Sequence, residues 1–444
     1  MNFADLHTGA TLEVIVTLTA NDQKLVTLKV LLFFTDKPFG GLGDIGVEAA
    51  VSSLVNKINY QNREVETYAL HALKKLHYQA DEKVLPSVLE VIKLSVQHIA
   101  WFLAAQHTIQ ENSMGEPIKS SIDEELNNAQ DHLYLLLSIA YDPNSIHHIR
   151  ENLESGTSEG IGFAIELLDI FVADEVKPVL FPVLDDSSIV EKIRQLQVEF
   201  PVVIMEPYEL LMGIINRDPN FISPVTRAGA IYMLSTIENL ELTDDLIAQI
   251  FNPDDMLCEL ASLQVEKLNK ELFGKVLDRL PAEKKSHLRK IITARSEQQE
   301  VLIWDKVGFV KQNPLFEGLP TILQYEVALR MERSDLKEGQ DICISGNTDD
   351  SGFALVRDGN VSVMLNNKEI GQLSSDDLTG ILPFMITEKD SLQIKAIGDS
   401  ILYVMSQESL DELIFDYEEM AMVMYRWTKD QQEKKSKQTK AMVS

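Results

Sequence analysis

The chain has 444 residues, of which 45% are hydrophobic and 25% are charged, the ordinary composition of a globular protein. Its 69 acidic residues against 40 Lys and Arg give a formal net charge of −29. This charge argues against nucleic acid as a partner and against docking of the whole surface onto anionic lipid, because phosphates would repel it, so partners should present basic or apolar surfaces.

Residues 1–44 fit two kinds of structure. The segments 11–20 and 24–34 are rich in β-branched residues, which suits strands, but they also fit a first pair of helices. Because a lone hairpin ahead of a helical domain would leave an apolar face uncovered, we expect helices here.

From about residue 45 to residue 300 the hydrophobic period is helical. The segments 62–76, 159–172 and 223–237 carry apolar residues at steps of three and four, which predicts amphipathic helices. In the second segment this stripe comprises Ile161, Ala164, Ile165, Leu168 and Phe171. In the third, Pro224 fits the first turn of a helix. A second amphipathic segment accompanies each, which resembles HEAT-type repeats and predicts an α-solenoid; a non-repeating helical bundle is the alternative.

After about residue 310 the pattern becomes that of strands. Residues 336–380 alternate short β-rich runs with turn residues. Glycines that favour positive φ are expected to mark the turns, at Gly339, Gly346, Gly352, Gly359 and Gly371. Residues 409–427 then predict an amphipathic helix, and a lysine-rich segment, 429–444, ends the sequence.

This part of the sequence resembles a cyclic-nucleotide-binding domain. The resemblance is carried by "NPLFEGLP" (313–320), "LKEGQDICISGN" (336–347) and "FALVRDGNVSV" (353–363), which occur in the family's order. It implies a small β-roll barrel with flanking helices.

The ligand-binding cassette of that family is degenerate here. In the family, a Gly-Glu pair contacts the ribose and a later Arg-Ala pair clamps the cyclic phosphate. The corresponding positions in this sequence are Gly380, Ile381, Leu382, Asp390 and Ser391. Ile381 replaces the glutamate, and no arginine occurs between Arg357 and Arg426. Losing a charge-assisted contact forfeits about 1.5–3 kcal/mol, and a carboxylate at the arginine position adds repulsion. We expect this site to be empty and the chain to need no cofactor.

Residues 164–196 resemble the HEAT-repeat section of bacterial nucleotide-translocase-like proteins, which tend to carry a cyclic-nucleotide-binding-like domain at the C-terminus. Their membrane part has no counterpart here, so the resemblance implies the cytosolic module alone. The predicted fold is α+β multidomain. It consists of a HEAT-like helical repeat domain (1–305), a cyclic-nucleotide-binding-like domain (306–428) and a basic tail (429–444).

Several features predict a cytoplasmic protein, either free or peripheral at the inner face of a membrane. Cys258 and Cys343 fit free thiols in a reducing compartment. The N-terminus lacks the layout of a secretion signal. Apolar runs such as 25–34 and 98–105 are shorter than the ~20 residues that cross a bilayer, so we expect no transmembrane segment.

No motif in the sequence predicts catalysis. Common hydrolase, zinc-protease and phosphate-loop motifs do not occur. Adjacent His147 and His148 would point about 100° apart on a helix, which favours a solvated helix start over a metal site. We expect a non-catalytic scaffold or accessory subunit that binds protein partners, for example in a membrane complex. The alternative is a sensor of a cyclic nucleotide or another small ligand that regulates a partner through the solenoid.

Overall fold

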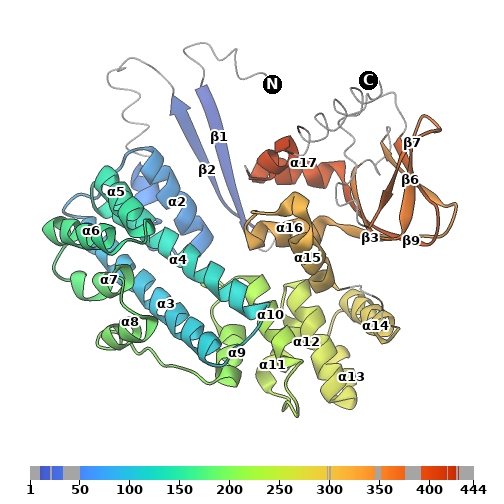
Figure 1. The fold of residues 1–444 in the computed structure, drawn as a ribbon, viewed down its shortest axis with the longest axis horizontal. Coiled ribbons are helices and arrows are strands. Elements are labelled where there is room, and N and C mark those ends of the chain that lie inside the picture. Colours follow the sequence, from blue (N-terminus) through green and yellow to red (C-terminus); the bar gives the residue numbers. More distant parts are fainter. Residues whose placement is uncertain are drawn as a thin grey trace. The chain divides into compact units, whose positions relative to one another are not determined.

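The structure is a computed structural model that describes residues 11–20, 23–33, 51–297, 299, 302–345, 352–375, 392–417, 419–426 and 429. These residues are mostly helical, with antiparallel strands, which gives an α+β organisation (Figure 1). The chain divides into two compact units, Met1–Ser223 (the first unit) and Pro224–Ser444 (the second unit). The domain limits at 305 and 428 rest on sequence patterns and remain predictions.

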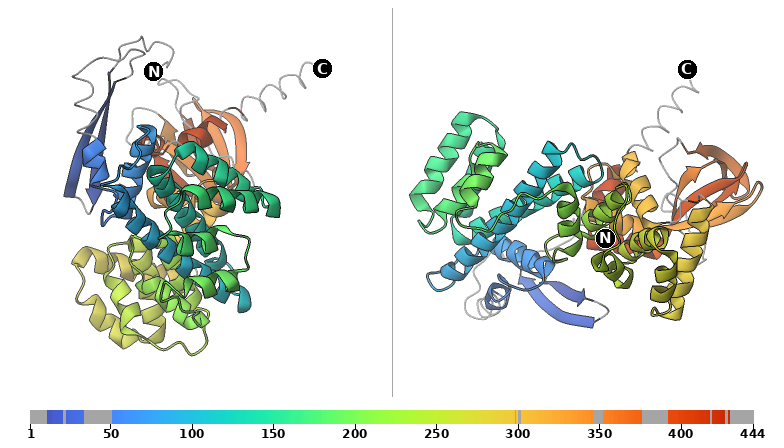
Figure 2. Two further views of the ribbon diagram at one scale, coloured as in Figure 1. Left: turned by 90° about the vertical axis from the view of Figure 1, so that its left-hand side faces the viewer. Right: turned by 90° about the horizontal axis from the view of Figure 1, so that it is seen from below.

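The segments near the N-terminus that we expected to be helical are strands. β1 (Thr11–Ala20) pairs antiparallel with β2 (Gln23–Phe33), drawn in blue in Figure 2. Their β-branched residues favour an extended backbone, because branching at Cβ restricts the side chain in a helix. Asn21 and Asp22, residue types common in hairpin turns, separate the two strands in the sequence. The expectation of a helix pair is therefore wrong for both segments.

The rest of the described first unit is helical. Its longest helix, α3, packs against α4, α7, α8 and α9 (Figure 1). The helices are α2 (Arg63–Lys75), α3 (Leu85–Glu111), α4 (Ile118–Ala140), α5 (Pro143–Glu154), α6 (Ser158–Phe171), α7 (Lys177–Leu184), α8 (Ile189–Leu196) and α9 (Pro207–Asn216).

Several of these helices begin at a polar cap. Asn62, Asp142 and Thr157 precede α2, α5 and α6, and each side chain accepts a hydrogen bond from a backbone N–H in the first turn. Such caps satisfy N–H groups that have no partner inside the helix and are each worth about 1 kcal/mol. The turns between helices are therefore encoded locally in the sequence.

α3 is the one described helix long and apolar enough, by length and composition, to cross a membrane. It extends well beyond the short run 98–105, and 67% of its most apolar window is buried within the structure. Fully buried side chains such as Ile92, Val96 and Ile99 line it. That burial is typical of a helix at the core of a folded unit.

The predicted apolar stripe of α6 is confirmed. Ala164 and Leu168 are fully buried, while Ile161, Ile165 and Phe171 are half-buried. α6 packs against α5 and α7. The stripe therefore gives the orientation of the helix correctly.

The second unit opens with helices. Pro224 is the first residue of α10, as predicted. The helices are α10 (Pro224–Leu234), α11 (Asp244–Ala248), α12 (Asp255–Leu268), α13 (Lys270–Leu277), α14 (Ala282–Ser296), α15 (Ile303–Gln312) and α16 (Thr321–Arg330), with 3-10 turns at Gln249–Phe251 and Pro314–Phe316.

Antiparallel strands follow, in two sheets. One sheet has the order β3-β9-β5 and the other β4-β8-β6-β7. The strands are β3 (Glu332–Leu336), β4 (Asp341–Ser345), β5 (Gly352–Asp358), β6 (Asn360–Leu365), β7 (Lys368–Ser374), β8 (Leu392–Ala396) and β9 (Ser400–Ser406), and α17 (Gln407–Asp416) comes next. Residues 419–426 are also helical.

Apolar side chains from both sheets share one core. Val356, Val361, Ile394 and Leu402 are among its buried members. The chain passes from β5 to β6, and so from one sheet to the other, at Gly359, whose φ is +87°. This arrangement agrees with the predicted small barrel flanked by helices.

The glycine predictions hold in part. Gly339 and Gly359 have positive φ, as expected of turn glycines. Gly352 instead begins β5, and Gly371 lies inside β7 opposite Val363, next to a register shift in the pairing with β6. Glycine inside a strand often accompanies such an irregularity, so these two were wrongly expected to be turns. Gly346 lies outside the described residues.

The two cysteines have different surroundings. Cys258 is buried in α12 and its Sγ donates to the carbonyl of Ile250 (3.1 Å). Burial raises the pKa of this thiol. Cys343 is half-buried on β4.

Candidate functional site

The cassette predicted from the sequence cannot be placed in the structure. Gly380, Ile381, Leu382, Asp390 and Ser391 all fall in residues 376–391, outside the described part of the chain. The empty nucleotide site therefore stays a prediction.

The neighbouring described strand bears on one open question, whether a lysine could replace the missing arginine. On β8, Leu392, Ile394 and Ala396 are buried in the core, whereas Lys395 is exposed. Successive side chains of a strand point to opposite faces, so Lys395 lies on the outer face of the sheet. It is therefore badly placed to contact a ligand held inside the barrel.

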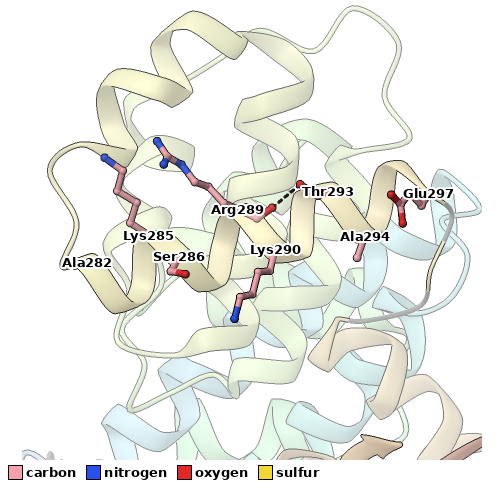
Figure 3. Close-up of a pocket in the computed structure, with 8 residues that line it drawn as sticks. All are labelled: Ala282, Lys285, Ser286, Arg289, Lys290, Thr293, Ala294 and Glu297. Carbon is pink, nitrogen blue, oxygen red and sulfur yellow. Dashed lines mark hydrogen bonds between the residues drawn. The ribbon is translucent and has the colours of Figure 1, made fainter. Parts of the chain in front are cut away.

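A surface hollow follows α14 in the second unit (Figure 3). Its lining consists of Ala282, Lys285, Ser286, Arg289, Lys290, Thr293, Ala294 and Glu297. All of them lie on α14 or directly after it. The hydrogen bond drawn in Figure 3, from Thr293 Oγ1 to the carbonyl of Arg289 (2.9 Å), lies within the helix.

The basic character of α14 has a structural explanation. Lys285 pairs with Asp278, Lys284 lies 3.5 Å from Asp255, and Arg295 lies 3.4 Å from Asp305. These carboxylates belong to the same unit, so the helix balances local acidic charge. We read the hollow as a solvated helix surface.

A more enclosed cavity of about 640 Å³ lies in the first unit. It is lined by residues of the segment 59–61, of α2, of α3, of the segment 200–202 and of the turn after α9. Four aromatic rings contribute to its walls, from Tyr60, Trp101, Phe200 and Phe221. Volumes of this size are typical of small-ligand sites in proteins.

The side chain of Arg217 is held against one wall of this cavity. Its guanidinium lies 4.0 Å from the centre of the Trp101 ring, and Nη2 donates to Nδ1 of His98 (2.9 Å). The buried Nε finds no acceptor among the described residues. Burial lowers the pKa of Arg217 to about 10, with Glu125 and Asp218 opposing the shift, so the group is charged at neutral pH.

His98 connects this arginine to the neighbouring aromatic residue. Its ring stacks on Phe221 with the centroids 3.7 Å apart. Burial, and then the charge of Arg217, lower the pKa of His98 to about 3. A neutral ring that accepts at Nδ1 carries its proton on Nε2.

A second arginine, Arg63, lines the same cavity from α2. It lies 3.6 Å from Glu66, and its guanidinium is 5.9 Å from the Phe221 ring centre. Glu66 is buried, and its Oε1 lies 3.5 Å from Nε2 of buried His132. Burial, the largest cause, lowers the pKa of Arg63 and also that of His132.

Sequence reasoning missed this cavity. Arg217 and His98 are 119 positions apart, and neither belongs to a known motif. The only pattern in the sequence that could have indicated it is weak, namely basic residues at helix ends in an otherwise acidic chain.

Among the described residues no group of three or more His, Cys, Asp or Glu could hold a metal ion. His147 and His148 are exposed on α5, each within 3.5 Å of Glu151, in agreement with a solvated helix start.

No protein-family model and no curated protein matches this sequence. Solved structures that are similar in part include crystal forms of the C-linker/CNBHD of zELK channels. Three of them have 19%, 16% and 16% sequence identity and TM-scores of 0.19, 0.20 and 0.17. They cover 34%, 38% and 36% of this chain and 97%, 95% and 93% of their own. Scores this low carry no argument about ligand or function.

Proposed function

We propose that the chain is a non-catalytic scaffold or accessory subunit that binds a protein partner through α6. The observation that supports this is the outer face of α6, which consists of Phe163, Leu167 and Ile170. Phe163 is 55% exposed and Ile170 is 80% exposed, with half-buried Leu167 between them. Steps of four and three residues put these side chains on one side of the helix, about 110° around the axis from buried Ala164 and Leu168. Contiguous exposed apolar surface is characteristic of interaction sites.

The charge around this face indicates the kind of partner. α6 carries exposed Glu159 and Glu166 and contains no Lys or Arg. A partner segment that combines apolar and basic side chains complements it, and its charge would also speed association with an acidic protein. The proposal of a membrane-associated complex in the cytoplasm, with HEAT-like packing of the helices, comes from the sequence resemblance described above.

Capture of partners from a native membrane fraction by the full chain tests this proposal. The double variant Phe163→Ser/Ile170→Ser should lose at least about tenfold of the captured partner, because two apolar contacts at an interface centre are removed. Val198→Ser is the matched control, since Val198 is also 80% exposed but belongs to the turn after α8. Equal capture by all three proteins would contradict the proposal.

For the C-terminal barrel, we propose a cyclic-nucleotide-binding-like domain that has lost its ligand. Ile381 and Asp390 at the glutamate and arginine positions support this. Calorimetry should give no binding of cyclic AMP or cyclic GMP tighter than about 100 μM, or some −5.5 kcal/mol. Tighter binding would favour the alternative, a nucleotide sensor.

A sensor of some other small ligand is the second candidate function. The cavity between α2, α3 and the turn after α9 supports it, because it combines small-ligand volume with half-buried cations.

A further inference from the structure

The cavity in the first unit holds a positive charge that the protein itself compensates only in part. Among the described residues no carboxylate forms an ion pair with Arg217, which contacts His98, Trp101 and Phe102. Stacking on an aromatic face replaces only part of the hydration that a buried guanidinium loses. An anion that enters the cavity would complete the compensation.

The charges on the cavity wall limit the charge of such an anion. Arg63 is offset by buried Glu66, 3.6 Å away. Glu125 and Asp218 favour the charged form of Arg217, but neither forms an ion pair with it among the described residues. Asp218 also lines the cavity but is exposed, and it accepts from the backbone and side-chain nitrogens of Asn220 (both 2.9 Å). Arg217 is therefore the arginine of this wall that has no ion-paired carboxylate among the described residues, which suits a monoanion better than a dianion.

The remaining lining determines the shape of the ligand. Tyr60, Trp101, Phe200 and Phe221 present aromatic surface, and aliphatic Val91 and Leu94 add to it. Aromatic side chains pack well against flat rings in stacked or edge-to-face arrangements. We infer that this cavity binds a small organic monoanion, a carboxylate carried on a flat aromatic body, with Arg217 as its principal charged contact.

This inference is independent of the scaffold function, since it concerns different residues and a different class of ligand. The probe is 2-naphthoate, titrated calorimetrically into the full chain. The dissociation constant should be about 1 mM or tighter, as expected of a small ligand in a preformed apolar site. 2-Naphthylmethanol, a neutral analogue of the same shape, should bind at least about tenfold more weakly to the same unmodified protein.

Variants then assign the contact to Arg217. Arg217→Met removes the charge but keeps a long apolar side chain, and should weaken 2-naphthoate binding at least about tenfold. Arg150→Met is the matched control, because Arg150 also lies over a ring of the first unit, that of Tyr134 at 5.0 Å, but outside the cavity. Its affinity for 2-naphthoate should equal that of the unmodified chain.

Each part of the inference has a result that would overturn it. Equal binding of 2-naphthoate and 2-naphthylmethanol, or no binding of 2-naphthoate at 10 mM, would overturn the inference without any variant. Inorganic phosphate that binds as tightly as 2-naphthoate would overturn the assignment to an aromatic carboxylate. A folded Arg217→Met variant that binds 2-naphthoate normally would overturn the role of Arg217.

Discussion

The turn at Gly359 offers a direct test of how the barrel closes. A Cβ added at this position would lie 2.6 Å from the carbonyl oxygen of Asp399 and 2.9 Å from Cα of Ser400. Both atoms belong to the backbone and cannot rotate away. Gly359→Ala therefore combines a steric clash with a positive φ that L-residues rarely adopt.

Gly339→Ala is the matched control. Gly339 has a similar φ, +81° against +87°, but a Cβ there would meet nothing within 4 Å. The conformational cost common to both variants is about 1–2 kcal/mol. Displacing packed backbone at Gly359 adds about 1–3 kcal/mol, so the totals are about 2–5 kcal/mol for Gly359→Ala and about 1–2 kcal/mol for Gly339→Ala.

Hydrogen–deuterium exchange of β9 gives the readout, because β9 is the central strand of its sheet and Ser400 is its first residue. The difference of about 1–3 kcal/mol corresponds to exchange roughly fivefold to 150-fold faster in Gly359→Ala than in Gly339→Ala. If both variants exchanged at the same rate, the close approach of Gly359 to residues 399 and 400 would be refuted.

Three further predictions follow from buried or charged groups. Leu168→Asp should lower the free energy of unfolding of the first unit by at least about 3 kcal/mol, because Leu168 is fully buried. Ile170→Asp, on the exposed side, should change it by less than about 0.5 kcal/mol, and equal melting temperatures of the two variants would refute the orientation of α6. Burial raises the pKa of Glu259, which accepts from His287 and the Ile303 N–H (both 2.9 Å), so the folded state binds this proton more tightly than the unfolded state. The free energy of unfolding should therefore fall as pH rises above 4.5, the pKa of this group in the unfolded chain, and urea titrations should show a weaker pH dependence in Glu259→Gln; an unchanged pH dependence would contradict the prediction. Deleting residues 429–444 should weaken partner capture by less than about tenfold, since each lysine near an acidic surface adds only about 1 kcal/mol; complete loss of capture would move the binding function to the tail.

Helix orientation was predictable from the sequence where one face alone is buried. On α6, Ala164 and Leu168 were identified correctly because the opposite face is exposed. α2 was harder: steps of three and four from Val65 place Tyr68 on an apolar stripe and leave Leu70 off it, yet Tyr68 is 50% exposed and Leu70 is fully buried. Local period cannot say which neighbours a helix has on its two sides, and α2 packs against α4, far along the chain.

The helix prediction for the two N-terminal segments failed for a related reason. The segment 11–20 carries residues that suit either a helix or a strand, and its pairing with β2 is decided by tertiary structure.

The cavity could not be predicted from the sequence, because Arg217 comes into contact with His98 and Trp101 only when the turn after α9 packs against α3. Single residues of this kind leave no periodic signal.

The two native cysteines differ enough in exposure to report on local opening of the second unit. An alkylating reagent should modify Cys343 on β4 first, because Cys258 is buried, donates to a backbone carbonyl and has a raised pKa that disfavours the reactive thiolate. Molecules with both thiols modified have therefore opened around α12, and mass spectrometry counts them without any engineered label. A partner or ligand that slows the second modification would reveal that its binding stabilises the second unit.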